Sequence, residues 1–92
     1  MTRYFSYDPN TNGVYLMATL HHGAWTYNSI CVICILENGK SGVNKLDHGY
    51  EFDEYVSITI DDDNHRIVIT NSGLATIHCA LYQLLKIKRG EL

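Results

Sequence analysis

Apolar and polar residues alternate along several short stretches of this chain, a pattern typical of β-strands with one face in a core. The alternation is clearest over residues 14–20 and 55–60. Shorter stretches at residues 3–7 and 66–70 follow the same period of two. The pattern therefore predicts a sheet built from strands that are close together along the chain.

One segment departs from simple alternation. Residues 25–36 are predominantly apolar, and their later half, Ile30 to Leu36, is apolar without interruption. A strand with apolar residues on both faces is covered on both sides or lies at the centre of a sheet. We therefore expect residues 25–36 to form a central strand.

Two turns are predicted between these strands. Asn38-Gly39 favours positive φ at both central positions of a type I′ turn, which predicts a hairpin between residues 30–37 and 40–47. The stretch Asp62-Asp63-Asn64-His65 separates two β-branched segments. Because Asp and Asn stabilise turns through their own side-chain hydrogen bonds, we expect a second hairpin loop there.

Residues 73–88 show a helical rather than a strand-like period. Their large apolar residues fall at the spacing of one helical stripe, and Ser72 or Asn71 precedes them as a potential N-cap. The residues of this stripe are Leu74, Ile77, Leu81, Leu84 and Leu85. We therefore predict a C-terminal helix that packs on the sheet through these side chains.

Together these elements predict one α+β domain over residues 1–92, with an antiparallel meander of five or six strands and one C-terminal helix packed on a face. A small, coiled barrel with the helix at one end is the alternative. The longest apolar run has seven residues, far fewer than the ~20 that a membrane span needs. The N-terminus lacks the apolar core of a signal peptide, and three cysteines fit a reducing compartment, so we expect a cytoplasmic protein.

No motif for catalysis, a cofactor or a metal is apparent. Cys31 and Cys34 have metal-ligand spacing, but on a strand they would point to opposite faces. None of the five histidines has the spacing of a zinc pair, and the Asp61 segment has Arg66 where a calcium loop needs Gly. We therefore expect no enzyme activity, no cofactor and no metal.

The distribution of charge is the most informative feature of the sequence. Residues 47–65 contain seven carboxylates and no Lys or Arg, whereas the net charge of the whole chain is only −3. The seven are Asp47, Glu51, Asp53, Glu54, Asp61, Asp62 and Asp63. Such a block repels nucleic acid and speeds association with basic partners.

Tyrosine accounts for seven of the ten aromatic residues, and Tyr is enriched at protein interfaces. Tyr50 and Tyr55 bracket three of the carboxylates. We expect these side chains to form one exposed, connected surface that binds a partner. The predicted partner-binding residues are Tyr50, Glu51, Asp53, Glu54, Tyr55, Asp61 and Asp62.

The sequence is most consistent with a non-enzymatic inhibitor that masks a basic, nucleic-acid-binding surface of a larger protein. Phage anti-defence proteins, other viral accessory proteins and nuclease immunity proteins are the classes that this analogy of size and charge suggests. This hypothesis includes no direct contact with nucleic acid or membrane, and it allows a homodimer. The alternative is a small enzyme or metabolite-binding protein with a His- and Tyr-lined pocket between helix and sheet. A structural homo-oligomer, with an exposed apolar strand or helix face, is a third possibility.

Overall fold

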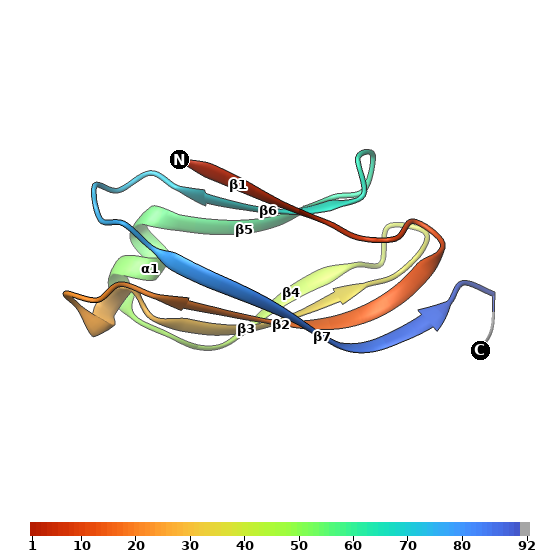
Figure 1. Cartoon of the computed structure of the whole chain (residues 1–92), viewed down its shortest axis with the longest axis horizontal. Helices are drawn as coiled ribbons and strands as arrows, with labels where there is room; N and C mark the ends of the chain where they lie inside the picture. The colour runs from red at the N-terminus through yellow and green to blue at the C-terminus, as the bar shows by residue number, and fades with distance from the viewer. Residues whose placement is uncertain (91–92) are drawn as a thin grey trace.

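The structure, a computed structural model, describes residues 1–90 and consists mainly of β-strands (Figure 1). The strands are β1 (Thr2–Ser6), β2 (Thr11–Leu20), β3 (Ser29–Ile35), β4 (Gly42–His48), β5 (Val56–Asp61), β6 (Arg66–Asn71) and β7 (His78–Lys88). Two short helices accompany them, the 3-10 helix η1 (Trp25–Tyr27) and the α-helix α1 (Tyr50–Tyr55). Sheet and helix are thus both present, but sheet dominates.

The strands form two antiparallel sheets, not the single meander predicted from the sequence. One sheet has the order β4-β3-β2-β7 and the other has the order β1-β6-β5. The chain begins in the second sheet, crosses to the first for β2, β3 and β4, and returns through α1 to β5 and β6. A second crossing then brings β7 alongside β2 (Figure 1).

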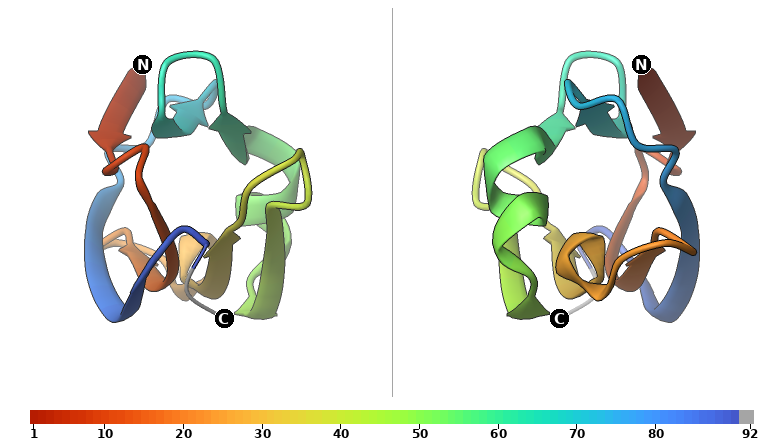
Figure 2. Two further views of the ribbon diagram at one scale, coloured as in Figure 1. Left: turned by 90° about the vertical axis from the view of Figure 1, so that its right-hand side faces the viewer. Right: turned by 90° about the vertical axis from the view of Figure 1, so that its left-hand side faces the viewer.

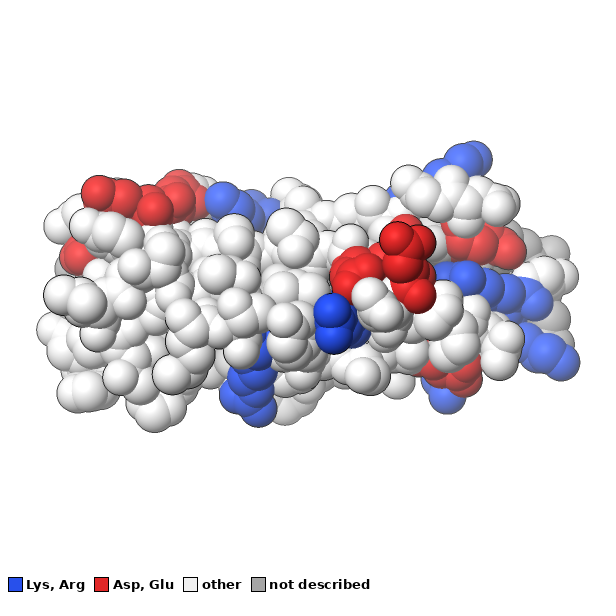
Figure 3. Space-filling view, turned by 90° about the horizontal axis from the view of Figure 1, so that it is seen from above, with Lys and Arg blue, Asp and Glu red and all other residues white. Residues whose placement is uncertain are grey.

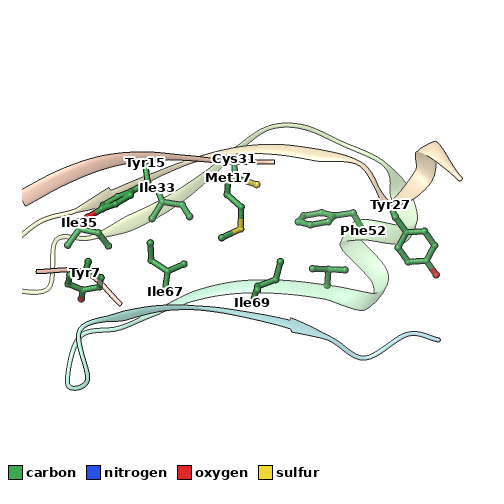
Figure 4. Packing of buried hydrophobic residues seen from close by; sticks show 11 residues of the cluster. Tyr7, Tyr15, Met17, Tyr27, Cys31, Ile33, Ile35, Phe52, Ile67 and Ile69 are labelled. Atoms are coloured by element: carbon green, nitrogen blue, oxygen red, sulfur yellow. The ribbon is translucent and has the colours of Figure 1, made fainter. Parts of the chain in front are cut away.

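The core lies between the two sheets, which occupy opposite sides of it in the end-on views of Figure 2. Met17 and Ile33 enter it from the four-stranded sheet, and Ile67 and Ile69 face them from the three-stranded sheet (Figure 4). Phe52 of α1 fills one end and is completely buried. The buried apolar residues are Tyr7, Tyr15, Met17, Tyr27, Cys31, Ile33, Ile35, Phe52, Val56, Ile67 and Ile69.

The predicted C-terminal helix is wrong, because residues 78–88 form the edge strand β7. This strand pairs with β2 from Leu20↔His78 to Thr11↔Lys88, with a bulge between Val14 and Tyr15. Leu81, which we expected on a helical stripe, lies opposite Met17 and packs against the core. Ladder hydrogen bonds along the whole length of β2 favour the extended conformation over the local helical propensity of this segment.

The predicted Asn38-Gly39 turn is confirmed. Asn38 and Gly39 have φ values of 61° and 69°, as a type I′ turn requires, and the amide of Lys40 donates to the carbonyl of Glu37 at 3.4 Å. The turn joins β3 to β4, which pair in antiparallel register. Residues 62–65 likewise form the predicted turn between β5 and β6.

The predicted strands at residues 3–7, 14–20, 55–60 and 66–70 correspond to β1, β2, β5 and β6. Their predicted ends differ from the observed ends by at most three residues. The strand predicted over residues 25–36 is present as β3, although it begins later because Trp25–Tyr27 forms η1. None of the helices within residues 1–90 is long and apolar enough to cross a membrane.

Candidate protein-binding surface

The acidic block of the sequence divides into two groups in space instead of forming one connected surface. One group lies on α1, with Asp47 of β4 on the chain segment before it, and the other lies at the turn between β5 and β6. The six residues of β5 separate the two groups by about 20 Å, at about 3.3 Å a residue. Figure 3 shows the acidic side chains of this face in separate groups, with neutral and basic side chains between them.

Two of the three carboxylates at the turn, Asp61 and Asp62, are hydrogen-bonded within the chain. Asp61 accepts hydrogen bonds from the amide and side chain of Asn64 and from Nε of Arg66 at 3.0 Å. These bonds, those of Asn64 first, hold the pKa of Asp61 below its ordinary value. Asp62 accepts a 2.8 Å hydrogen bond from the hydroxyl of Tyr7. Asp61 and Asp62, both predicted to bind a partner, therefore have partners within the chain.

Asp53 is also engaged within the molecule. Its carboxylate contacts Nζ of Lys45 and Nδ1 of His48, each at 2.8 Å, and so ties α1 to β4. The Lys45 hydrogen bond is the main reason why the pKa of Asp53 is lowered. We conclude that Asp53 positions the helix and contributes little free negative charge to the surface.

Tyr55, the last residue of α1, faces the interior more than the solvent. It is half-buried, and its ring stacks on Tyr27 with centroids 6.2 Å apart. The neighbouring Glu54 carboxylate raises the pKa of the Tyr55 phenol. Tyr55 is therefore only partly exposed, and its ring supports the packing of α1 against η1.

Tyr50, at the start of α1, is one of the most exposed aromatic residues of the chain, with 66% of its surface accessible. Trp25 of η1 is 71% exposed and meets Tyr50 edge to face, with ring centroids 6.4 Å apart. Glu54 is exposed and shares a helix face with Tyr50, since the two residues are four apart. Two aromatic rings and a carboxylate are thus presented together to solvent.

Two hydrogen bonds hold η1 and α1 in this arrangement. The Thr26 hydroxyl donates to Oε1 of Glu51 at 2.6 Å, and the amide of Gly49 donates to the carbonyl of Asn28 at 2.9 Å. Gly49 is buried against the backbone of Thr26, which leaves no room for a side chain. The backbone segments that carry Trp25 and Tyr50 are therefore held together by hydrogen bonds and close packing.

A hollow of about 400 Å³ adjoins this pair. Ala18 and Ile30 line it, together with Trp25, Asp47 and the loop residue Asn28. The side-chain oxygen of Asn28 is buried and has no hydrogen-bond partner within residues 1–90. A buried acceptor without a donor is costly.

We call Trp25, Asp47, Tyr50, Glu51 and Glu54, with this hollow, the aromatic–acidic end. Within residues 1–90, no Lys or Arg forms an ion pair with its three carboxylates. The arrangement offers aromatic area and negative charge that no Lys or Arg neutralises. Such a surface is suited to a basic partner.

The described residues contain no metal-binding cluster. No group of three His, Cys, Asp or Glu residues within residues 1–90 could hold a metal ion. Cys31 and Cys34 lie on opposite faces of β3, as the sequence predicts, and burial raises the pKa of the Cys31 thiol. The alternative pocket between a C-terminal helix and the sheet has no counterpart, because those residues form β7.

Trp25 is the residue that sequence reasoning overlooked. It is the only Trp of the chain and it directly follows the His22-Gly23-Ala24 break, which places it in a connection between strands. An aromatic residue in a loop is a candidate for binding, and this signal is present in the sequence itself. Comparison of the chain with protein-family models, curated proteins and solved structures gave no match.

Proposed function

We propose that this chain is a non-enzymatic protein-binding inhibitor that covers a basic, nucleic-acid-binding surface of a larger protein. The observation that carries the proposal is the exposed edge-to-face pair of Trp25 and Tyr50 beside the unpaired carboxylates Glu54 and Asp47. Anti-defence proteins of phages and immunity proteins of nuclease toxins are the classes that this chemistry favours.

Each part of the aromatic–acidic end has a role in this proposal. Trp and Tyr are the side chains that most often dominate the binding energy of an interface, and here they are exposed on a rigid base. Carboxylates attract a Lys- or Arg-rich groove and accept paired hydrogen bonds from Arg.

The proposal places Tyr50, Glu51 and Glu54 of the predicted set in the binding surface and adds Trp25 and Asp47. Asp53, Asp61 and Asp62 have a supporting part, since each is already bound to groups of this chain. Their charge still contributes to long-range attraction, which depends on the summed field of the molecule.

The first experiment identifies the partner by affinity capture from the native host and mass spectrometry. Binding of the purified partner is then measured for the wild type, Trp25→Ala and Glu54→Lys. Trp25→Ala should weaken binding by about 30-fold or more, the equivalent of about 2 kcal/mol. Glu54→Lys should slow association and flatten its dependence on salt.

Asp63→Lys is the matched control, because Asp63 is an exposed carboxylate at the turn between β5 and β6, away from the aromatic–acidic end. It should change the affinity much less than Glu54→Lys. A DNA or RNA duplex that the partner binds should compete with the wild-type chain. The proposal fails if nucleic acid and this chain bind the partner together, or if Trp25→Ala and Glu54→Lys bind as tightly as the wild type.

A further inference from the structure

The two sheets differ in the chemistry of their outer faces. The three-stranded sheet follows the usual alternation, and Ser57 and Thr59 of β5 point to solvent beside Thr70 of β6. The four-stranded sheet does not, because the outward residues of three of its strands, β2, β3 and β7, are also apolar. These residues, here called the outer apolar face, are Val14, Leu16, Ala18, Leu20, Ile30, Val32, Cys34, Ala80, Tyr82 and Leu85. Ala18 and Ile30 form the edge at which this face meets the hollow of the aromatic–acidic end.

The register of the strands brings these side chains together. Leu16 lies between Val32 of β3 and Tyr82 of β7, and Val14 lies between Cys34 and Leu85. Tyr82 and Leu85 are 59% and 50% exposed. The three-stranded sheet lies on the other side of the core (Figure 1), so no part of residues 1–90 covers this face.

The outer apolar face explains the uninterrupted apolar run of the sequence. An antiparallel sheet with one face in water ordinarily alternates apolar and polar residues. In β3, Ile30, Val32 and Cys34 interrupt that rule, although the inward residues already supply the core. A strand that is apolar on both sides is expected to be covered on both sides.

We propose that a second copy of this chain covers the outer apolar face, so that the two four-stranded sheets stack face to face. A two-fold contact brings the same patch of both copies together, so the patch must be complementary to itself. β2 and β3 contain no charged residue, so the centre of the contact would hold no pair of like charges. The same neutrality provides no charge complementarity for a different partner.

The face is large enough for a weak dimer. Its residues lie on three strands about 4.8 Å apart, and the ten residues of β2, at about 3.4 Å each, give it an area of about 490 Å². Two copies would then bury about 1,000 Å², the size of a weak interface. Stacked sheets pack about 10 Å apart, as the two sheets of a sandwich do.

The test is the mass of the particle in solution, measured by light scattering after size-exclusion chromatography between about 1 and 100 µM, which covers the weaker affinities of interfaces of this size. The wild type should have twice the 10.5 kDa mass of the chain. Val32→Lys places a charge at the centre of the face and should give the monomer mass. Thr59→Lys, on the outer side of β5, is the matched control and should remain a dimer.

A second measurement covers the case in which Val32→Lys does not fold. Cys34 belongs to the face, whereas Cys31 is buried. In a Cys79→Ser background, alkylation of Cys34 should slow as the protein concentration rises, because dimer formation covers the thiol. A monomer at every concentration, a dimer that persists in folded Val32→Lys, or a Cys34 reaction rate independent of concentration would overturn the proposal.

Discussion

Gly49→Ala tests the framework that holds the aromatic–acidic end. Gly49 directly precedes α1, and a Cβ at this position would overlap the backbone of Thr26 in η1. Carbon atoms in contact are about 3.5 Å apart, so relief of the overlap takes a backbone movement of more than about 1 Å. The neighbour is backbone and cannot rotate away as a side chain could.

The cost follows from what that movement disturbs. Insertion of a group into a packed site costs about 1–3 kcal/mol. Separation of η1 from α1 also lengthens the 2.9 Å hydrogen bond between the amide of Gly49 and the carbonyl of Asn28. Loss of this hydrogen bond costs about 1 kcal/mol of stability. We therefore expect Gly49→Ala to lower the free energy of unfolding by about 2–4 kcal/mol. This is a large part of the roughly 5–14 kcal/mol expected for a domain of this size.

The assay is urea unfolding followed by circular dichroism and by the fluorescence of Trp25, the only Trp of the chain. Gly42→Ala is the matched control, since an added Cβ at the start of β4 meets nothing within 4 Å. It should leave stability unchanged or raise it by about 0.4–1 kcal/mol through the entropy of the unfolded chain. Equal unfolding midpoints for the two variants would refute the close approach of η1 and α1. Unchanged native fluorescence in Gly49→Ala would show that Trp25 does not depend on this framework.

Three further variants test other parts of the fold. Phe52→Ala removes a completely buried ring and should cost about 3–5 kcal/mol in urea unfolding; a loss below about 1 kcal/mol would place this ring outside the core. The double variant Asn38→Ala and Gly39→Val puts side chains that disfavour positive φ into the type I′ turn, and should cost about 1–3 kcal/mol; an unchanged melting temperature would remove that assignment. Burial, with the hydrogen bond to Asp62, raises the pKa of Tyr7 above its ordinary 10.0. The stability from this group is therefore complete below pH 10.0 and declines above it, as tyrosinate forms in the unfolded chain. Tyr7→Phe should reduce the loss of stability between about pH 9 and about 11, measured by urea unfolding, and an identical pH profile would contradict this linkage.

Local chemistry was sufficient for much of the secondary structure. An Asn-Gly pair readily adopts the two positive φ angles that a type I′ turn requires. The hairpin of β3 and β4 could therefore be predicted from Asn38 and Gly39 alone. The alternation over residues 14–20 and 66–70 predicts β2 and β6 for a similar reason, because successive side chains of a strand point to opposite faces. The apolar run in β3 likewise indicates a strand with two apolar faces, because no polar residue interrupts it.

Three features depended on tertiary structure. Residues 78–88 fit a helical stripe, and only the long pairing with β2 makes them a strand. Residues 50–55 could have been extended, but as α1 they bury Phe52 and expose Tyr50. The carboxylates are neighbours in sequence, yet β5 carries one group away from the other, and contacts with Lys45, Arg66 and Tyr7 engage several of them.

The sequence by itself thus determined the conformations that short-range sterics and side-chain alternation control: the turns, most of the strands and the two-sided apolar character of β3. Tertiary structure decided which strands pair, that the strands divide into two sheets, and that Trp25 meets Tyr50 at one end. The physical reason is that these outcomes depend on contacts between residues far apart in the chain. The free energy of these long-range contacts exceeds the local conformational preference of each segment. It cannot be read from a short stretch of neighbouring residues.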